Sequence, residues 1–130
     1  MNKVVLDTNV LVSAFWKRPG NAGKIIDMVI TRQLIPCYNA KVLLEYLDVL
    51  NRPKFKFSSS DVNNLLELIK IEGISVIAQR SSIPFVDESD RIFYDIATTC
   101  RAYLITGNLK HYPNEPFIIT PGQFLTAAPQ

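Results

Sequence analysis

The stretch Val4-Val5-Leu6-Asp7-Thr8-Asn9-Val10-Leu11 carries an apolar run that stops at a carboxylate, a hydroxyl and an amide. A continuous apolar run is typical of a buried strand in a parallel sheet. In open α/β sheets, ligands bind just beyond the carboxyl ends of the strands. We therefore expect a strand over residues 3–7 that leaves Asp7 where a site would lie. The same Asp could instead cap a helix over residues 9–16.

Length and composition predict a single domain over residues 1–130, since 48% hydrophobic residues supply a full core. The net charge of +2 gives only modest general attraction to a polyanion. The opening apolar run is too short for a signal peptide or a membrane span. Cys37 and Cys100 lack metal-like spacing, which predicts a reduced pair in a cytoplasmic protein. His111 is the only histidine, which excludes His-rich metal sites and most Ser-His-Asp chemistry.

Strand and helix patterns alternate along the whole chain. We expect further strands over residues 34–38, 74–77, 103–106 and 117–119, with Pro36 placing the first of these at a sheet edge or strand start. We expect a helix capped by Asn21, a helix over 40–50 capped by Asn39, a helix from Ser60 to Gly73, and helices over 89–101 and from Pro121 onward. This order predicts an α/β fold, a three-layer α/β/α sandwich with a central parallel sheet.

Acidic and amide side chains stand where these elements meet. One edge of the predicted sheet would gather Asp7, Asp87, Asp90 and Gly107-Asn108. Glu45 lies inside an apolar helix, where a charge either faces water or is held in a cleft. Asp90 alone could simply favour the dipole at the start of its helix.

Several carboxylates in one cleft repel one another, and a divalent cation is the usual compensation. Hard oxygen ligands suit Mg²⁺ or Mn²⁺. Such an ion polarises a phosphoryl oxygen and lowers the pKa of a bound water, and two ions about 3.5–4 Å apart clamp both oxygens in phosphodiester cleavage. That chemistry needs neither histidine nor cysteine, which this chain almost lacks.

Four blocks stand out in order along the chain: Asp7-Thr8-Asn9-Val10-Leu11-Val12-Ser13, the helix 44–50 followed by Arg52-Pro53-Lys54-Phe55, Asp87-Glu88-Ser89-Asp90-Arg91-Ile92-Phe93, and Leu104-Ile105-Thr106-Gly107-Asn108. Their order and spacing resemble the PIN domain, and more narrowly the PIN-family toxin components of bacterial and archaeal toxin–antitoxin systems. The resemblance covers nearly the whole chain. It implies a Rossmann-like sandwich and a metal-dependent endoribonuclease.

The resemblance also implies roles for individual residues. The catalytic, metal-binding acids would be Asp7, Glu45 and Asp90, with Thr8, Asn9 and Thr106 in support. The family's Thr-Gly-Asp block reads Thr106-Gly107-Asn108 here, so Asn108 keeps an oxygen ligand but loses a charge. Asp87, and less favourably Asp95, could compensate for that charge, and occupancy of a second metal depends on it. As an alternative, Asn108 is only a turn residue, Asp87 only a cap and Asp95 only a solvated residue.

The run Arg52-Pro53-Lys54-Phe55-Lys56-Phe57 interleaves positive charge with aromatic rings, a combination that single-stranded RNA binding uses. We expect Arg52, Lys54 and Lys56 to bind RNA, with a solvated loop as the alternative. A second basic group near Asp7 would comprise Lys17, Arg18 and Lys24. Phe15 and Trp16 are expected in the core or an interface, with a base-stacking platform as the less favoured alternative, and His111 and Tyr112 in a loop.

The leading hypothesis is therefore an Mg²⁺- or Mn²⁺-dependent ribonuclease that acts as a toxin. The resemblance implies an RNA substrate, a small antitoxin protein whose segment fills the cleft, and a homodimer. The alternative is a non-catalytic PIN domain that binds RNA or a partner protein, because Asn108 weakens the site. A haloacid-dehalogenase-type phosphatase needs an Asp where Asn9 stands, and a nucleotide-binding domain needs a Gly-rich loop after the first strand.

Overall fold

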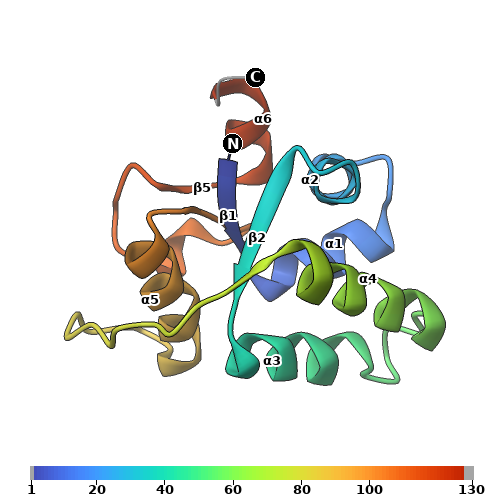
Figure 1. Ribbon diagram of the computed structural model, residues 1–130, viewed down its shortest axis with the longest axis horizontal. Helices are drawn as coiled ribbons and strands as arrows, with labels where there is room; N and C mark the ends of the chain where they lie inside the picture. Colours follow the sequence, from blue (N-terminus) through green and yellow to red (C-terminus); the bar gives the residue numbers. More distant parts are fainter. Residues whose placement is uncertain (1, 128–130) are drawn as a thin grey trace.

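The computed structural model describes residues 2–127, and its central feature there is a five-stranded parallel sheet. The strands are β1 (Asn2–Leu6), β2 (Leu34–Tyr38), β3 (Ile74–Ser75), β4 (Tyr103–Ile105) and β5 (Ile118–Ile119). Their order across the sheet is β3-β2-β1-β4-β5, so the first strand in the chain is also the central one (Figure 1). The predicted α/β fold with a parallel sheet is confirmed.

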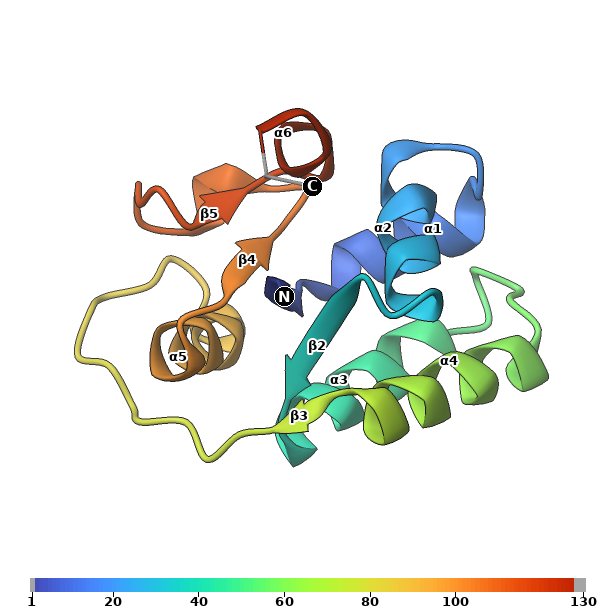
Figure 2. The same cartoon turned by 45° about the horizontal axis from the view of Figure 1, so that its top comes forward.

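Helices flank this sheet on both sides. They are α1 (Thr8–Trp16), α2 (Asn21–Ile30), α3 (Ala40–Leu50), α4 (Ser59–Glu72), α5 (Arg91–Cys100) and α6 (Pro121–Ala127), with short 3-10 turns at η1 (Glu88–Asp90) and η2 (Leu109–His111). Helix α5 packs against β1, β2 and β4, whereas α2 and α4 pack against β2 from the other side (Figure 2). Val4, Val5 and Leu6 of β1 are buried between these layers.

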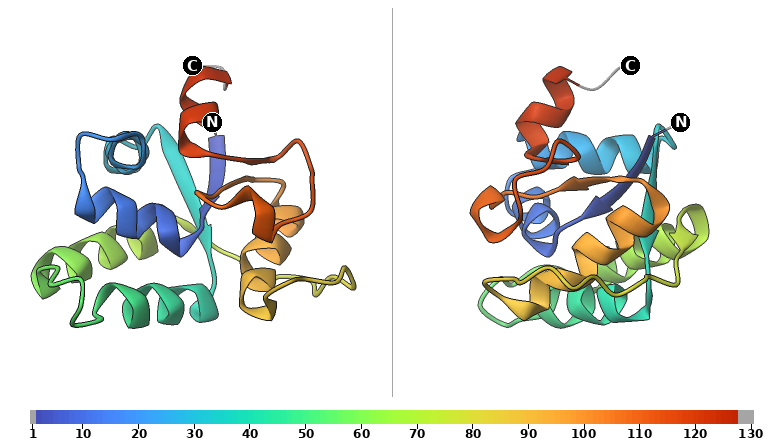
Figure 3. Two further views of the ribbon diagram at one scale, coloured as in Figure 1. Left: turned by 180° about the vertical axis from the view of Figure 1, so that it is seen from behind. Right: turned by 90° about the vertical axis from the view of Figure 1, so that its left-hand side faces the viewer.

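The carboxyl ends of β1 and β4 lie side by side, and this positions the candidate site. Leu6 pairs with Ile105 in the parallel register, and the backbone N–H of Asp7 then donates to the carbonyl of Ile105 at 3.0 Å. Asp7 and Thr106 therefore leave their strands as neighbours. The C-terminal helix α6 packs on α2 at the opposite end of the sheet, beside the start of β1 (Figure 3).

Local hydrogen bonds set where the helices begin, and the sequence predicts some of these starts better than others. Asn39 caps α3 as predicted, because its side chain accepts from the N–H of Val42 at 2.9 Å. Helix α4 starts earlier than predicted, since Ser58 accepts from the N–H of Asp61. Asn21 is the first residue of α2 rather than its cap, and Gly20 takes the cap position.

Two expectations about the β2–β3 edge are corrected. The predicted strand 74–77 shrinks to Ile74–Ser75, because β2 offers only Cys37 and Tyr38 for pairing before the chain turns into α3. Pro36 lies in the middle of β2, which runs between β1 and β3, and not at a sheet edge or a strand start. Pairing between β2 and β3 begins at Cys37, one residue after Pro36. The N–H that Pro36 lacks is therefore not part of the β2–β3 pairing.

No helix among residues 2–127 combines the length and the apolar character that a bilayer span requires. Cys37 and Cys100 are free cysteines. The single domain over residues 1–130 stays a prediction, since residue 1 and residues 128–130 lie outside the described part.

Candidate metal centre

Asp7 presents a buried carboxylate at the carboxyl end of the central strand. It is 7% exposed and precedes α1, yet its side chain makes no cap hydrogen bond. Instead, Oδ2 accepts from the hydroxyls of Thr106 at 2.8 Å and Tyr112 at 2.9 Å, and from Nδ2 of Asn9 at 3.4 Å. These are the hydrogen bonds that residues 2–127 make to the carboxylate, so Oδ1 is left without one. The alternative of a simple helix cap is therefore wrong for Asp7.

Asn9 and Thr106 join the two strand ends into one network. The Asn9 side chain donates to Thr106 Oγ1 at 3.4 Å and accepts from the N–H of Gly107 at 2.9 Å. Thr106 Oγ1 also accepts from the N–H of Asn108 at 3.0 Å. The predicted supporting residues Asn9 and Thr106 thus lie where they fix the Asp7 side chain.

Asp90 is the second buried acid and lies close enough to Asp7 to feel its charge. Burial first, and then the negative charge of Asp7, raises the pKa of Asp90 to about 6. Its Oδ2 lies 3.2 Å from Nδ1 of half-exposed His111. No donor among residues 2–127 makes a well-directed hydrogen bond to this buried oxygen. A buried carboxylate oxygen without a hydrogen bond is costly unless a ligand or ion satisfies it.

Glu45 is the third acid, and it is half-buried on α3. Burial raises its pKa, the charge of Arg52 opposes that rise, and the charges of Asp48 and Asp7 add to it. Thr8 lies beside this carboxylate and lowers its pKa, although no well-formed hydrogen bond from residues 2–127 satisfies the buried Thr8 hydroxyl. The negative charge of Asp7 therefore acts on both Asp90 and Glu45. We call these three residues the acid cluster.

The oxygen donors of the acid cluster fit a hard divalent cation. Among the described residues, no three His, Cys, Asp or Glu side chains stand close enough to share one ion directly. Mg²⁺, however, keeps several waters and is usually bound by one or two carboxylates. The free Oδ1 of Asp7 and the unsatisfied Oδ2 of Asp90 are the oxygens that such an ion would take. The metal-binding role of Glu45 stays a prediction.

Asp87 and Asn108 lie at the margin of this cluster. The exposed Asp87 caps the η1 turn, because its Oδ1 accepts from the N–H of Ser89 at 3.0 Å and from the Ser89 hydroxyl at 2.8 Å. These two hydrogen bonds lower the pKa of Asp87. Asn108 is half-exposed and holds the turn before His111 through its backbone. The metal-binding roles of Asp87 and Asn108 stay predictions.

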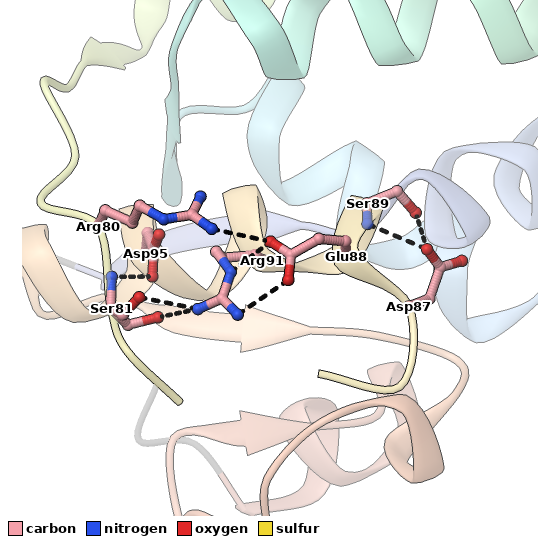
Figure 4. A network of polar contacts seen from close by, with 7 residues as sticks. All are labelled: Arg80, Ser81, Asp87, Glu88, Ser89, Arg91 and Asp95. Atoms are coloured by element: carbon pink, nitrogen blue, oxygen red, sulfur yellow. Dashed lines mark hydrogen bonds and ion pairs between the residues drawn. The ribbon is translucent and has the colours of Figure 1, made fainter. Parts of the chain in front are cut away.

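A buried arginine fixes the segment that carries Asp90. Arg91 donates to both Glu88 oxygens, at 2.5 and 2.9 Å, and to the carbonyl and hydroxyl of Ser81, each at 2.9 Å. Figure 4 shows Arg91 between Ser81 and Glu88. Asp95 is 5% exposed and accepts from the N–H of Ser81 at 3.2 Å, so the alternative of a solvated Asp95 is wrong. The 81–90 segment is thereby held on α5.

Tyr112 and His111 are the site neighbours that sequence reasoning missed. Both were expected in an uninvolved loop, yet Tyr112 donates to Asp7 and His111 lies against Asp90. The signal that could have found them is position, because the loop after β4 leaves the sheet beside the end of β1. A buried tyrosine hydroxyl needs a partner, and here that partner is a strand-end carboxylate.

The predicted basic residues do not lie together: Arg52 is close enough to Glu45 of the acid cluster for its charge to oppose the rise in the pKa of that carboxyl. Arg52 pairs with Asp48 at 3.2 Å, while Lys54 and Lys56 are exposed on the α3–α4 loop. The second basic group does not lie near Asp7 as expected. Lys17, Arg18 and Lys24 follow the far end of α1, about 12 Å along the helix from its start.

Comparison with known proteins identifies the family of this chain. A family model described as the PIN domain matches residues 3–110. The chain belongs to the PIN domain family. PIN domains are a family of nucleases, and they typically use a divalent metal. The chain is also 30% identical over 109 residues to "Uncharacterized protein MJ1680" of Methanocaldococcus jannaschii, covering 82% of this chain and 70% of that protein.

Proposed function

We propose that this PIN domain is an endoribonuclease that uses Mg²⁺ or Mn²⁺ at the acid cluster to hydrolyse RNA phosphodiester bonds. The observation that carries the proposal is the Asp7 carboxylate, which has one oxygen held by Thr106, Tyr112 and Asn9 and the other free. Three donors on one oxygen orient a carboxylate for a ligand on its other oxygen.

The protein's own residues supply orientation and charge. When bound, the cation would polarise the phosphodiester and lower the pKa of a water molecule. Asp7 and Asp90 would hold it, since burial and then the negative charge of Asp7 already raise the pKa of Asp90. Thr106 and Tyr112 keep Asp7 in a single orientation, which avoids reorganisation during the reaction. Neither a histidine base nor a thiol is needed for this chemistry.

The test is an RNA cleavage assay with increasing Mn²⁺, repeated after chelation with EDTA. We expect cleavage that depends on metal and that the Asp90→Asn variant loses. Asp61→Asn, which removes an exposed carboxylate at the start of α4, is the matched control and should cleave normally. Metal-independent cleavage, or equal loss in both variants, would contradict the proposal.

The second candidate function is a non-catalytic PIN domain that binds RNA or a partner protein. Asn108 favours it, because an amide replaces the acid of the family's Thr-Gly-Asp block and removes a negative charge from the site. RNA binding without cleavage at any Mn²⁺ concentration would support this alternative. Restoration of cleavage by Asn108→Asp would show that the missing charge is the cause.

The proposed role is that of a toxin with a small antitoxin protein as partner, and the chain would act as a homodimer in the cytoplasm. This part rests on the resemblance to PIN-family toxins. Expression of the wild-type chain should arrest growth, while Asp90→Asn should not. Co-expression of a short neighbouring gene should relieve the arrest, and arrest by both forms would contradict the toxin role.

A further inference from the structure

A cluster of aromatic rings lies outside the acid cluster, where α1 ends. Trp16 is the last residue of α1, and its ring centre lies 5.7 Å from that of Phe55 and 6.3 Å from that of Phe57. Phe55 and Phe57 stack on each other at 5.1 Å, and Phe57 stacks on Phe15 at 5.2 Å. We call Phe15, Trp16, Phe55 and Phe57 the aromatic patch.

Trp16 is the exposed member of the aromatic patch. It is 67% exposed, although large aromatic side chains usually bury most of their area. Phe15 and Phe57 pack against the hydrophobic core and hold the patch from below. The rings of Phe55 and Phe57 meet the Trp16 ring nearly at right angles, at 81° and 85°. Trp16 thus makes edge-to-face contacts with both phenylalanine rings while much of its surface faces solvent.

Three lysines surround the aromatic patch without a carboxylate partner among residues 2–127. They are Lys17 directly after Trp16, and Lys54 and Lys56 on either side of Phe55. The amino group of Lys54 lies 5.1 Å from the centre of the Phe55 ring. By contrast, the neighbouring arginines are paired, Arg18 with Asp27 at 2.6 Å and Arg52 with Asp48 at 3.2 Å.

The backbone of Lys56 has an unusual conformation between the two stacked rings. Lys56 takes a φ of 56°, in the left-handed region that a lysine rarely adopts. The turn at this residue lies between the two stacked phenylalanine rings. A strained residue of this kind persists only where its surroundings hold it.

We propose that the aromatic patch binds single-stranded RNA, with a base stacked on Trp16 and phosphates contacted by Lys17, Lys54 and Lys56. Proteins that bind single strands combine exposed aromatic rings with unpaired cations in this way. Charge complementarity favours RNA over a protein partner, because phosphates recur along the strand whereas a protein would have to supply three matched carboxylates. The inference rests on the proposed function only in taking RNA as the substrate.

The position of the patch is suited to holding a substrate beyond the cleavage site. Helix α1 runs from the acid cluster at Thr8 to Trp16, about 12 Å along its axis. Helix α3 carries Glu45 and leads into the loop that holds Phe55 and Phe57. The end of α1 and the α3–α4 loop lie on the same side of the molecule, away from α5 (Figures 2 and 3). One RNA strand can therefore follow α1 from the acid cluster to Trp16.

Trp16 is the only tryptophan in the chain, so its fluorescence reports on this surface directly. The experiment titrates the full chain with short oligoadenylate and with an RNA duplex of equal length, both in EDTA so that no metal-dependent cleavage occurs. We expect quenching by the single strand, and much weaker quenching by the duplex. No quenching by oligoadenylate, or equal quenching by both, would overturn the inference.

Substitutions separate stacking from charge. Trp16→Ala should weaken oligoadenylate binding by roughly tenfold or more, measured by fluorescence anisotropy of labelled RNA. Lys54→Gln with Lys56→Gln should keep the tryptophan, weaken binding, and lower the slope of log affinity against log salt by about 0.7 per lysine. Ile77→Ala and Lys70→Gln remove an exposed apolar residue and an exposed charge elsewhere, and should bind normally. Loss of binding in these two controls as well would contradict the inference.

The outcomes distinguish this inference from the proposed function. Quenching in EDTA without cleavage in Mn²⁺ would support the aromatic patch and reject the nuclease. Metal-dependent cleavage with a Trp16 signal that RNA never changes would support the nuclease and overturn the patch. Emission that changes with protein concentration and not with RNA would indicate a second copy of the chain on this surface, and would also overturn it.

Discussion

Asp7 and Asp87 both stand directly before a helical turn, and they use their carboxylates in opposite ways. Asp87 is exposed and caps its turn with two hydrogen bonds from Ser89. Asp7 is buried, leaves the start of α1 uncapped, and accepts from Thr106 and Tyr112 instead. The same residue type in the same local position therefore has a structural task in one region and a site-forming geometry in the other.

The difference arises from tertiary neighbours and not from local sequence. Around Asp87, the donors are two residues away in the chain. Around Asp7, Asn9 donates from two residues away at 3.4 Å, but the two shorter hydrogen bonds come from residues 106 and 112, brought there because β4 pairs with β1. A carboxylate whose bonds come from distant elements is fixed by the whole fold, and its position is that of a functional group.

The largest expected effect is a difference in RNA cleavage between substitutions of Asp7 and of Asp87. Asp7→Asn keeps the shape and most hydrogen bonds but removes the charge, and we expect RNA cleavage in Mn²⁺ to fall by more than about 100-fold, since loss of even a supporting group costs about 10–100-fold. Asp87→Asn should retain activity within a few-fold in the same assay. Equal losses would remove the distinction between the two regions.

Tyr112 sharpens the comparison, because its hydroxyl reaches Asp7 across the fold. Tyr112→Phe should lower Mn²⁺ affinity, measured by isothermal titration calorimetry, and RNA cleavage by about 10–100-fold. Tyr94→Phe removes another tyrosine hydroxyl, bonded to Glu115, and serves as the matched control. If both variants bind Mn²⁺ like the wild type, Tyr112 does not position Asp7.

The charge of Asp7 also acts on Asp90, which predicts a pH-dependent stability in the metal-free protein. Burial and Asp7 raise the pKa of Asp90 from 3.8 to about 6. Between these values the folded state holds a proton that the unfolded state releases, so the free energy of unfolding falls as pH rises through this window. Asp90→Asn should therefore stabilise the protein at neutral pH by on the order of 2 kcal/mol.

Urea unfolding in EDTA, at neutral pH and at about pH 4, checks this prediction. The gain in Asp90→Asn should be present at neutral pH and much smaller near pH 4, where Asp90 is protonated in the folded state and partly protonated in the unfolded state. Asp61→Asn, at the start of α4, is the control and should show no such gain. A destabilised Asp90→Asn at neutral pH would mean that the two acids do not oppose each other.

The smallest expected effect concerns the cap itself. Asp87→Ala removes the acceptor for both Ser89 donors, so the melting temperature should fall slightly while the Mn²⁺ affinity stays unchanged. Asp87→Ser, which restores a capping side chain, should recover the melting temperature. A large loss of Mn²⁺ affinity in Asp87→Ala would place Asp87 among the metal ligands.

Much of the fold was predictable because its signals are local. The strand 34–38, the helix 40–50 and the Asn39 cap follow from short-range patterns, and the structure has them at the predicted bounds. The strand after Gly73 was predicted too long, because its length depends on how much of β2 remains unpaired. The length of this strand is therefore set by its pairing with β2 and not by residues 74–77 themselves.

The candidate site was predictable in part for the same reason. Asp7, Asn9 and Thr106 stand at strand ends, which are readable from the apolar runs before them. Tyr112 and Asp95 were misjudged because their partners, Asp7 and Ser81, lie 105 and 14 residues away. Their burial depends on how the loops 107–117 and 76–88 fold back, which no periodic pattern encodes.

The most direct test is the anomalous diffraction of a crystal soaked in Mn²⁺. The account predicts a peak bonded to Oδ1 of Asp7 and to Asp90, with Tyr112 and Thr106 still donating to Oδ2. A peak at Asp87 in place of these acids, or full soaking with no peak near Asp7, would contradict it.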